Sequence, residues 1–442
     1  MKLKPNIIFI MVDDLGKEWV SCYGSENSYT PNIDRLAQEG MKFNNAYSMA
    51  QCTPTRVSLL TGKYPYNSGW VNHWDVPRWG SGYFDWDRYL TFARILKDEG
   101  YATAAAGKWQ INDFRLEPEA MRKHGFDDWC MWTGYEAENP PSGERYMDAY
   151  INTPEGSRTY DGQFGPDIFS DFVTDFLYEH KDKPMLIYYP MVLTHGPFVP
   201  TPDEPEVKGA QNRFAAMVRY TDKIVGKIKD AVEAAGIADN TILFFTTDNG
   251  SPGGMIGKRY GRDINGAKAK ITEPGLCQPF LVWGPGLVKA GSERNALTAF
   301  VDMLPTFAEL GGAELPDSIS IDGRSIASVI FGKDTVGPHG WIMGMGHGPA
   351  RWTEKGVAPK LDFAERSIRD REFKVIVNPD RQITHLFNLL SDPFEDNNLL
   401  EGVNDYGDIL IKFQAILDSM PEKDAWPQYR QRAANSWDIK LN

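Results

Sequence analysis

Cysteine is scarce and scattered in this sequence. Among the 442 residues there are four cysteines, Cys22, Cys52, Cys130 and Cys277, and none of them is spaced as Cys-x-x-Cys. A disulfide-stabilised small domain or a structural zinc site needs grouped cysteines, so the scatter is typical of neither class. Cys52 is discussed below, and we expect the other three to be buried thiols.

Positive charge is also in short supply. Lys and Arg number 47 against 60 Asp and Glu, which gives a formal net charge of −13. An acidic surface is repelled by nucleic acids and by anionic membranes, so we expect neither as a partner. If the ligand is an anion, its site must supply positive charge locally.

A long apolar run is missing from the beginning of the chain. The apolar run of residues 6–12 ends at Asp13 and Asp14 after seven residues, whereas a membrane-spanning helix needs about 20. The small-residue cleavage site of a signal peptide is missing as well. We therefore expect a cytoplasmic protein on the sequence as given, or a periplasmic or secreted one if a signal was trimmed.

The rest of the composition is that of an ordinary globular protein, with 42% hydrophobic and 24% charged residues. Apolar strands are predicted over residues 6–12, 101–106, 184–193 and 241–247, and helical patterns alternate with them. The polar residues that follow these strands are Asp13, Asp14, Lys108, His195, Asp248 and Asn249. In α/β sheets the carboxyl ends of the strands are where ligands bind.

Four of these residues offer oxygen donors of the kind that hard cations prefer. Asp13, Asp14, Asp248 and Asn249 favour Ca²⁺ or Mg²⁺ over zinc. Adjacent carboxylates beside an apolar core are also costly unless something neutralises them. The alternatives are a solvated turn at Asp13 and Asp14 and an ordinary turn at Asp-Asn-Gly.

The stretch from Cys52 to Arg56 reads Cys-Thr-Pro-Thr-Arg. Pro54 predicts the first position of a short helix, and Gly62 predicts its end. Cys52 would then lie just before the helix, in the positive field of its amino end, with Arg56 one turn further on. The sequence therefore predicts a place for an anion or an oxyanion here, and the alternative is a buried structural cysteine beside a surface arginine.

Arg56, Lys108 and Lys268 could hold an anionic group during its transfer. Together with the proposed cation ligands they indicate hydrolysis of a sulfate or phosphate ester, without choosing between the two. Lys270 is a rival for the role of Lys268.

Motifs that occur in the same order as in a known family favour the sulfate ester, by resemblance. Cys52 to Arg56 resembles the Cys-x-Pro-Ser/Thr-Arg signature of the sulfatases, and further motifs of that family follow in order as far as Leu399. They are Thr30-Pro31-Asn32-Ile33-Asp34, Gly107-Lys108-Trp109, His195 with Pro197, Asp248-Asn249-Gly250, Lys268 with Glu273, and Asp392-Pro393 with Asn398-Leu399. The chain is identified as a member of the type I, formylglycine-dependent sulfatases of the alkaline-phosphatase-like superfamily.

This resemblance implies an α/β fold with a mixed, mostly parallel sheet flanked by helices. We expect a catalytic domain over residues 1–340 and a smaller C-terminal α+β subdomain over residues 341–442. The subdomain should contain a small antiparallel sheet and a closing helix. The implied substrate is a sulfate ester, and the sulfated saccharide is our expectation for it.

The resemblance also implies roles for single residues. A formylglycine-generating enzyme would oxidise Cys52 to formylglycine, the nucleophile, and residue 52 would join the four oxygen donors as a ligand of Ca²⁺, with Mg²⁺ possible. Arg56 and Lys108 would be catalytic. His195, with Lys268, would protonate the leaving alcohol.

One position departs from the family pattern. The family shows Gly-Lys-Trp-His where this sequence has Gln110, and glutamine cannot act as a base at neutral pH. The resemblance places that histidine close to the second step, in which the second hydroxyl of the hydrated formylglycine loses its proton and sulfate is eliminated. Asp14, His73 or water could replace the histidine, or turnover could be slow at that step.

Aromatic residues crowd residues 64–89, where they could stack on sugar rings or simply pack a long loop. Gln110, His73, Trp74 and Arg78 are the candidate substrate contacts.

Three other functions remain open at this point. The first is a phosphate or phosphonate ester hydrolase of the same fold. The second is an inactive carbohydrate-binding homologue, and the third is a metal-binding protein with a plain thiol.

Overall fold

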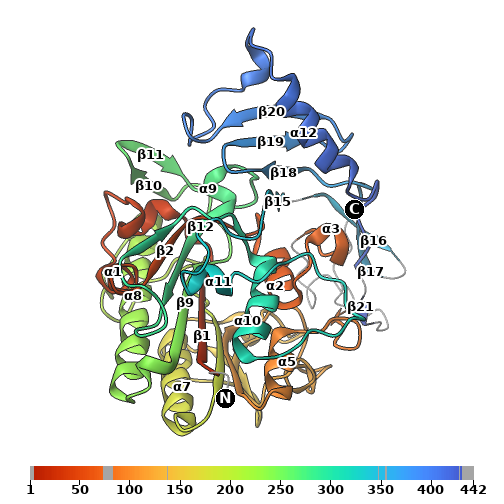
Figure 1. Ribbon diagram of the computed structural model, residues 1–442. Coiled ribbons are helices and arrows are strands. Elements are labelled where there is room, and N and C mark those ends of the chain that lie inside the picture. Colours follow the sequence, from red (N-terminus) through yellow and green to blue (C-terminus); the bar gives the residue numbers. More distant parts are fainter. Residues whose placement is uncertain are drawn as a thin grey trace.

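A large mixed sheet forms the centre of the molecule, with helices on both faces (Figure 1). The computed structural model describes residues 4–72, 83–136, 138–346, 348–353, 356–427 and 429–430. Within them the central sheet has 11 strands, and a smaller four-stranded sheet lies beside it near the end of the chain (Figure 1). The predicted α/β architecture is confirmed.

The order of the central sheet is β13-β2-β12-β9-β1-β8-β4-β5-β6-β7, with β14 paired to β2. The strands are β1 (Asn6–Val12), β2 (Met41–Tyr47), β4 (Ala102–Lys108), β5 (Asp128–Trp132), β6 (Tyr150–Thr153), β7 (Gly156–Thr159), β8 (Met185–Pro190), β9 (Thr241–Thr247), β12 (Cys277–Trp283), β13 (Ser292–Arg294) and β14 (Thr298–Ala299). β1, β4, β8 and β9 run parallel. β12 is antiparallel to both β9 and β2, so β2 points the same way as β9. The carboxyl ends of these five parallel-running strands therefore meet at one edge.

β1 shows why the sheet is covered on both faces. All seven of its residues are buried, as a continuous apolar run predicts for a central parallel strand. Side chains alternate between faces, so Phe9 joins the cluster that contains α2, α5 and α10, with its ring 5.6 Å from that of Phe307. Ile8 and Ile10 join the cluster on the other face, with α1, α7 and α8.

The helices flank the sheet in two groups (Figure 1). They are α1 (Pro31–Glu39), α7 (Gly165–His180) and α8 (Ala210–Ala234) on one face, and α2 (Cys52–Thr61), α5 (Phe92–Asp98) and α10 (Met303–Gly311) on the other. The predicted start of α2 at Pro54 is wrong by two residues, because the helix already begins at Cys52. Its predicted end is confirmed: Gly62 has φ 67° and its N–H donates to the Ser58 carbonyl.

The second sheet has the order β15-β18-β19-β20 and is antiparallel throughout. Its strands are β15 (Ile342–Met345), β18 (Arg366–Arg369), β19 (Phe373–Val377) and β20 (Ile383–Asn388), and α12 (Gly407–Asp418) follows them. A turn separates β18 from β19. The Asp370 carboxylate accepts the N–H groups of Glu372 and Phe373, which makes a turn there.

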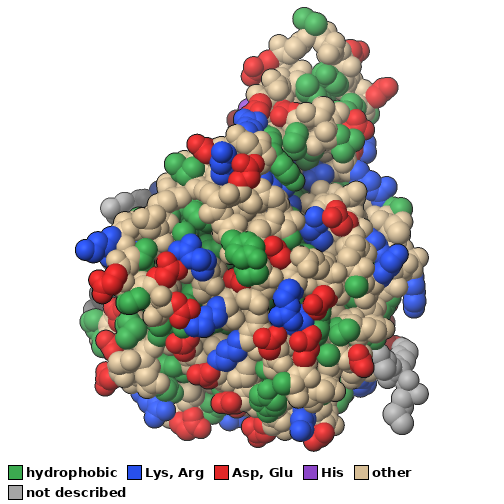
Figure 2. All heavy atoms as spheres, turned by 90° about the vertical axis from the view of Figure 1, so that its left-hand side faces the viewer, with side chains coloured by type: hydrophobic (Ala, Val, Ile, Leu, Met, Phe, Trp, Pro, Cys, Tyr) green, Lys and Arg blue, Asp and Glu red, His purple; other side chains and the backbone are tan. Residues whose placement is uncertain are grey.

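Shorter elements complete the described chain. They are α3 (Pro65–Ser68), α6 (Ala120–Lys123), α9 (Glu273–Leu276), α11 (Ala327–Ile330), β3 (Tyr83–Phe84) with β21 (Tyr429–Arg430), β10 (Ile256–Arg259) with β11 (Arg262–Asn265), and β16 (Ala350–Thr353) with β17 (Gly356–Pro359). None of the helices in the described ranges has the length and apolar character that crossing a membrane requires. Basic and acidic side chains are interspersed over the face shown in Figure 2.

Candidate active site

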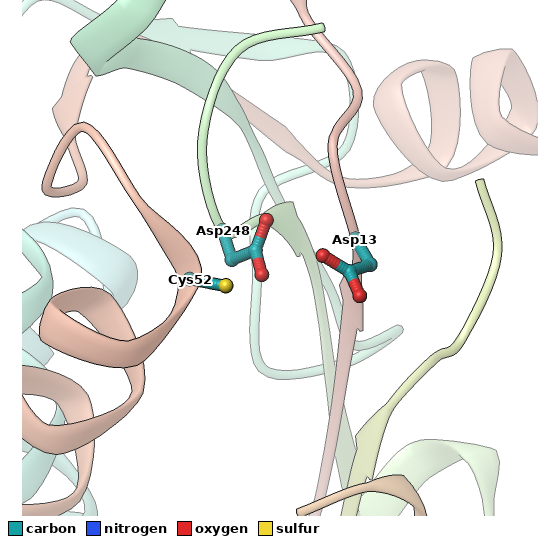
Figure 3. Close-up of side chains that lie close together, drawn as sticks. All are labelled: Asp13, Cys52 and Asp248. Atoms are coloured by element: carbon teal, nitrogen blue, oxygen red, sulfur yellow. The ribbon is translucent and has the colours of Figure 1, made fainter. Parts of the chain in front are cut away.

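The carboxyl edge of the sheet gathers the predicted polar residues. Asp13 and Asp14 follow β1, and Asp248 and Asn249 follow β9, while Lys108 is the last residue of β4. β2 runs toward the same edge and leads into the amino end of α2. Cys52 therefore faces Asp13 and Asp248 (Figure 3). One ligand atom from each of these three buried residues lies within 4.8 Å of the others.

Asp13 is fully buried, and positively charged side chains lie close to it. Its Oδ2 lies 2.7 Å from Lys108 Nζ and 3.7 Å from Arg56 Nη2, and both of these cationic side chains are 1% exposed. Burial alone would raise the pKa of Asp13, but Lys108, His195 and Arg56 hold it well below its usual value. Asp13 is therefore a carboxylate ready to bind a cation.

Arg56 joins β4 to β9. Its Nη1 donates to the Lys108 carbonyl at 3.0 Å, and its Nη2 donates to Asp248 Oδ2 at 2.9 Å. Burial and the neighbouring Asp13 carboxylate push the pKa of Asp248 upward, against the opposing effect of Arg56. The sequence left open the alternative that Arg56 is a surface arginine. That alternative is wrong, because Arg56 is buried.

Asp14 forms hydrogen bonds with several other residues of the cluster. Its φ of 65° is left-handed, a conformation that aspartate tolerates better than most residues. Its N–H donates to Asp248 Oδ1 at 3.0 Å, and its Oδ1 accepts from Asn249 Nδ2 at 2.7 Å. Its Oδ2 accepts from Lys268 Nζ at 2.7 Å. The alternative of a solvated turn is excluded, since both aspartates are buried.

Two buried oxygens of this cluster bear on the predicted cation. Asp13 Oδ1 and Asn249 Oδ1 have no hydrogen-bond partner among the described residues. A buried oxygen without a partner is costly, and a hard divalent cation is the natural partner for a set of carboxylate and amide oxygens. The residues present therefore fit a divalent cation held by Asp13, Asp14, Asp248 and Asn249.

His195 and Lys268 both face Asp14. His195 Nε2 lies 3.7 Å from Asp14 Oδ2, the same oxygen that binds Lys268. Burial lowers the pKa of His195 to about 3. Burial also favours the neutral form of Lys268, but the Asp14 carboxylate prevails and raises its pKa above the ordinary value. Between the two lysines that the sequence left open, Lys268 is the one at the cluster, and Lys270 is exposed.

β4 and β8 differ from their predicted ends. β4 extends to Lys108, and β8 ends at Pro190, five residues before His195. The chain nevertheless stays on the sheet edge as far as Thr194, whose N–H donates to the Asp13 carbonyl at 2.7 Å. Hydrogen bonds to the end of β1 therefore hold the chain beside the sheet up to Thr194, and His195 follows directly without further strand pairing.

Gln110, the position that departs from the family pattern, is 5% exposed. Its backbone N–H donates to the Thr133 carbonyl at 2.9 Å, and its φ is 71°. It remains a predicted substrate contact. The other three candidates, His73, Trp74 and Arg78, lie outside the described residues.

Arg145 and Tyr146 are neighbours of His195 that sequence reasoning missed. The Tyr146 hydroxyl donates to the Val192 and His195 carbonyls, and Arg145 donates to the Gly196 carbonyl. They lie between β5 and β6. No local pattern marks them, because the contact spans about 50 residues of sequence.

Comparison with known proteins gives consistent results. A family model described as Sulfatase matches residues 5–313. N-acetylgalactosamine-6-sulfatase from Homo sapiens is 30% identical over 74% of this chain and 66% of its own length, so the match spans just under two thirds of that relative. N-acetylgalactosamine-6-O-sulfatase from Bacteroides thetaiotaomicron is 27% identical over 94% of this chain and 93% of its own. The crystal structure of Ps i-CgsB, at 24% identity, has a TM-score of 0.79 and covers 96% of this chain and 94% of that chain, which shows a shared fold.

Proposed function

Because this chain belongs to the sulfatase family, we propose that it hydrolyses a sulfate ester carried by a saccharide. The observation that carries the proposal is the convergence of Cys52, Asp13 and Asp248 (Figure 3). The amino end of a helix favours an anion or oxyanion at this place. The saccharide is supported by the relatives named as N-acetylgalactosamine 6-sulfatases.

Ca²⁺ is the cation that we propose, with Mg²⁺ as the second possibility. The four oxygen-donating residues come from two separate loops, and Ca²⁺ accepts about six to eight oxygens in flexible geometry, whereas Mg²⁺ demands a near-ideal octahedron. The bound cation would polarise the nucleophile and lower its pKa.

The nucleophile is proposed to come from Cys52. Oxidation of its side chain by a formylglycine-generating enzyme would supply a hydrated aldehyde. One of its hydroxyls would attack sulfur while the S–O bond to the alcohol breaks. In the second half of the reaction the other hydroxyl would lose its proton, and sulfate would be eliminated to restore the aldehyde. Arg56 and Lys108 supply buried positive charge next to Asp13 and Asp248. That charge offsets the negative charge of the sulfate group in the transition state.

His195 and Lys268 are assigned to the leaving group. Lys268 Nζ lies 2.7 Å and His195 Nε2 lies 3.7 Å from the same oxygen of Asp14, which places both nitrogens at the rim of the cluster. Their side chains are 25% and 21% exposed, unlike the buried Arg56 and Lys108. We assign the proton to Lys268, which Asp14 keeps charged, and the unprotonated Nε2 of His195 passes it to the oxygen of the departing alcohol as the S–O bond breaks.

The test is the mass of the tryptic peptide that contains residue 52, from protein co-expressed with a formylglycine-generating enzyme. An aldehyde mass, together with loss of sulfatase activity in Cys52→Ala, is expected. A thiol mass despite competent maturation would contradict the mechanism and favour a binding protein.

Matched aryl sulfate and aryl phosphate esters separate the sulfatase from a phosphatase of the same fold. The expected result is a higher kcat/KM on the sulfate ester, and a preference for phosphate would contradict the proposal. A sulfated and an unsulfated form of one saccharide then test the substrate class.

A further inference from the structure

Two consecutive side chains hold the backbone on both sides of His195. The Tyr146 hydroxyl lies 2.5 Å from the His195 carbonyl and 2.9 Å from that of Val192, and its proton is shared between them. Arg145 Nη2 donates to the Gly196 carbonyl at 2.9 Å. Arg145 is 7% exposed and Tyr146 is 3% exposed. Both donors are therefore shielded from water.

The Gly196 carbonyl has a second partner, the imidazole of His195, whose Nδ1 lies 2.7 Å away. Since a carbonyl oxygen can only accept, Nδ1 must carry the hydrogen. The other ring nitrogen, Nε2, then faces the Asp14 side of the cluster. The position of one carbonyl thus determines both the orientation and the tautomer of the ring.

Sterics alone do not hold Gly196 in place. A Cβ added there would meet only the Phe198 ring, at 3.9 Å, so the backbone has open space around it. Glycine also has more conformational freedom than other residues. The hydrogen bonds of the segment to β1 end at Thr194, so beyond that residue the Gly196 carbonyl is held by Arg145 on one side and meets the His195 ring on the other.

Arg145 is itself held in one orientation. Its guanidinium lies 4.2 Å from the ring centroid of Trp132, the last residue of β5. Trp132 in turn donates from Nε1 to the Ser142 carbonyl at 2.9 Å. A planar guanidinium stacked on an indole keeps its donors in a fixed plane, which the ammonium of lysine would not do.

We propose that Arg145 is a positioning residue for His195: it fixes the Gly196 carbonyl, and that carbonyl holds the imidazole with Nε2 directed at the departing oxygen. This inference rests on the proposed function, in which His195 serves the leaving group. Tyr146 holds the carbonyl of His195 itself and that of Val192.

The first experiment compares matured Arg145→Met and wild type on a series of aryl sulfates whose leaving groups differ in basicity. A poor leaving group depends on proton donation and a good one does not. General acid catalysis is worth about 10²–10⁴ in rate, so we expect kcat/KM to fall about a hundredfold for the poorest leaving group. For nitrophenyl-type sulfates we expect less than about a threefold loss.

Two variants serve as references. Arg122→Met removes another arginine that lies over a tryptophan, Trp129, away from His195, and should leave the whole series unchanged. Arg145→Lys keeps the charge without the planar donor. Its kcat/KM should also fall more for poorer leaving groups, but less steeply than in Arg145→Met. An equal loss across the series in Arg145→Met would mean a merely structural role and would overturn the proposal.

The second experiment needs no turnover. Nitrogen NMR of the ¹⁵N-labelled histidines, with His195→Gln used for assignment, reports the tautomer of His195. We expect the Nδ1-protonated form in wild type and a mixture of tautomers in Arg145→Met, or in Arg145→Lys if the first variant does not fold. An unchanged signal would overturn the positioning role. Because this readout does not depend on sulfate hydrolysis, it separates failure of this inference from failure of the proposed function.

Discussion

Lys108 Nζ lies 2.7 Å from Asp13 Oδ2, and neither side chain is more than 1% exposed. The pair joins the ends of β4 and β1, two strands that are separated by β8 in the sheet. One residue of this buried ion pair, Lys108, is assigned to catalysis, and the other, Asp13, is assigned to cation binding.

Lys108→Met should unfold more easily than wild type. Removing one partner of a buried ion pair leaves the other charge uncompensated and costs about 3–5 kcal/mol. Urea denaturation without added cation measures this loss, and added Ca²⁺ should recover part of it by neutralising Asp13. The control is Lys223→Ala, which breaks an exposed pair with Asp203 and should cost about 0–1 kcal/mol. Equal losses in the two variants would contradict the assignment.

Calcium should stabilise the folded protein. At a free concentration one hundred times its Kd, a ligand that binds only the folded state adds about 2.7 kcal/mol. Asn249→Leu removes the amide oxygen that lacks a protein partner and should shift the required Ca²⁺ concentration upward. Thermal unfolding across a Ca²⁺ titration measures both effects, with Asn212→Leu on the surface of α8 as control. A chelator that leaves Tm unchanged would contradict the cation site.

His124 should make stability fall in mild acid. It is fully buried, with its ring 4.7 Å from that of Phe84, and burial lowers its pKa to about 3. The unfolded value is about 6.5. Between these values only the unfolded chain binds the proton, so stability drops as pH falls, by about 1.4 kcal/mol per pH unit, and levels off below about pH 3.

His124→Phe keeps a ring in this place and removes the titrating group. Urea unfolding between pH 6 and 4 should therefore give a slope that is shallower by about 1.4 kcal/mol per unit than in wild type. His195, whose pKa is lowered in the same direction, contributes to both proteins and cancels in the difference. Identical slopes would refute the role of His124.

Lys374 should be needed to dock the second sheet. Its fully buried ammonium lies 2.7 Å from Glu395 and 3.2 Å from Glu273 of α9. Lys374→Met leaves two carboxylates, only 14% and 4% exposed, without this partner and should cost about 3–5 kcal/mol. Adding Glu273→Gln and Glu395→Gln to the same chain should restore much of the stability. If the triple variant is weaker than the single one, the buried charges are not the cause.

Gln110→His tests the departure from the family pattern. If the missing histidine limits the second half of the reaction, restoring it should raise kcat, and a pre-steady-state burst should become smaller. Gln110→Leu, which removes the amide at similar size, is the control and should not raise kcat. Turnover that is unchanged or lower in Gln110→His would mean that Gln110 does not limit that step.

Strand patterns predicted much of the fold, because a run such as residues 7–12 of β1, which is apolar throughout, is typical of a strand buried on both faces. Element ends were less certain. The end of β8 depends on backbone partners elsewhere in the chain, and α2 begins two residues early because the Thr55 N–H donates to the Gln51 carbonyl. The turn at Asp370 depends on a side chain accepting two N–H groups, which strand propensity does not register.

By itself, the sequence determined that Asp13, Asp14, Lys108 and Asp248 come at the carboxyl ends of apolar strands, since strand period and the polar residues that end a strand are local properties. Only the tertiary structure decided that Lys268, and not Lys270, reaches Asp14, and that Arg56 is buried. It also placed Arg145 against Gly196. These contacts join segments far apart in the chain, and burial and hydrogen-bond geometry select them only after the sheet has formed.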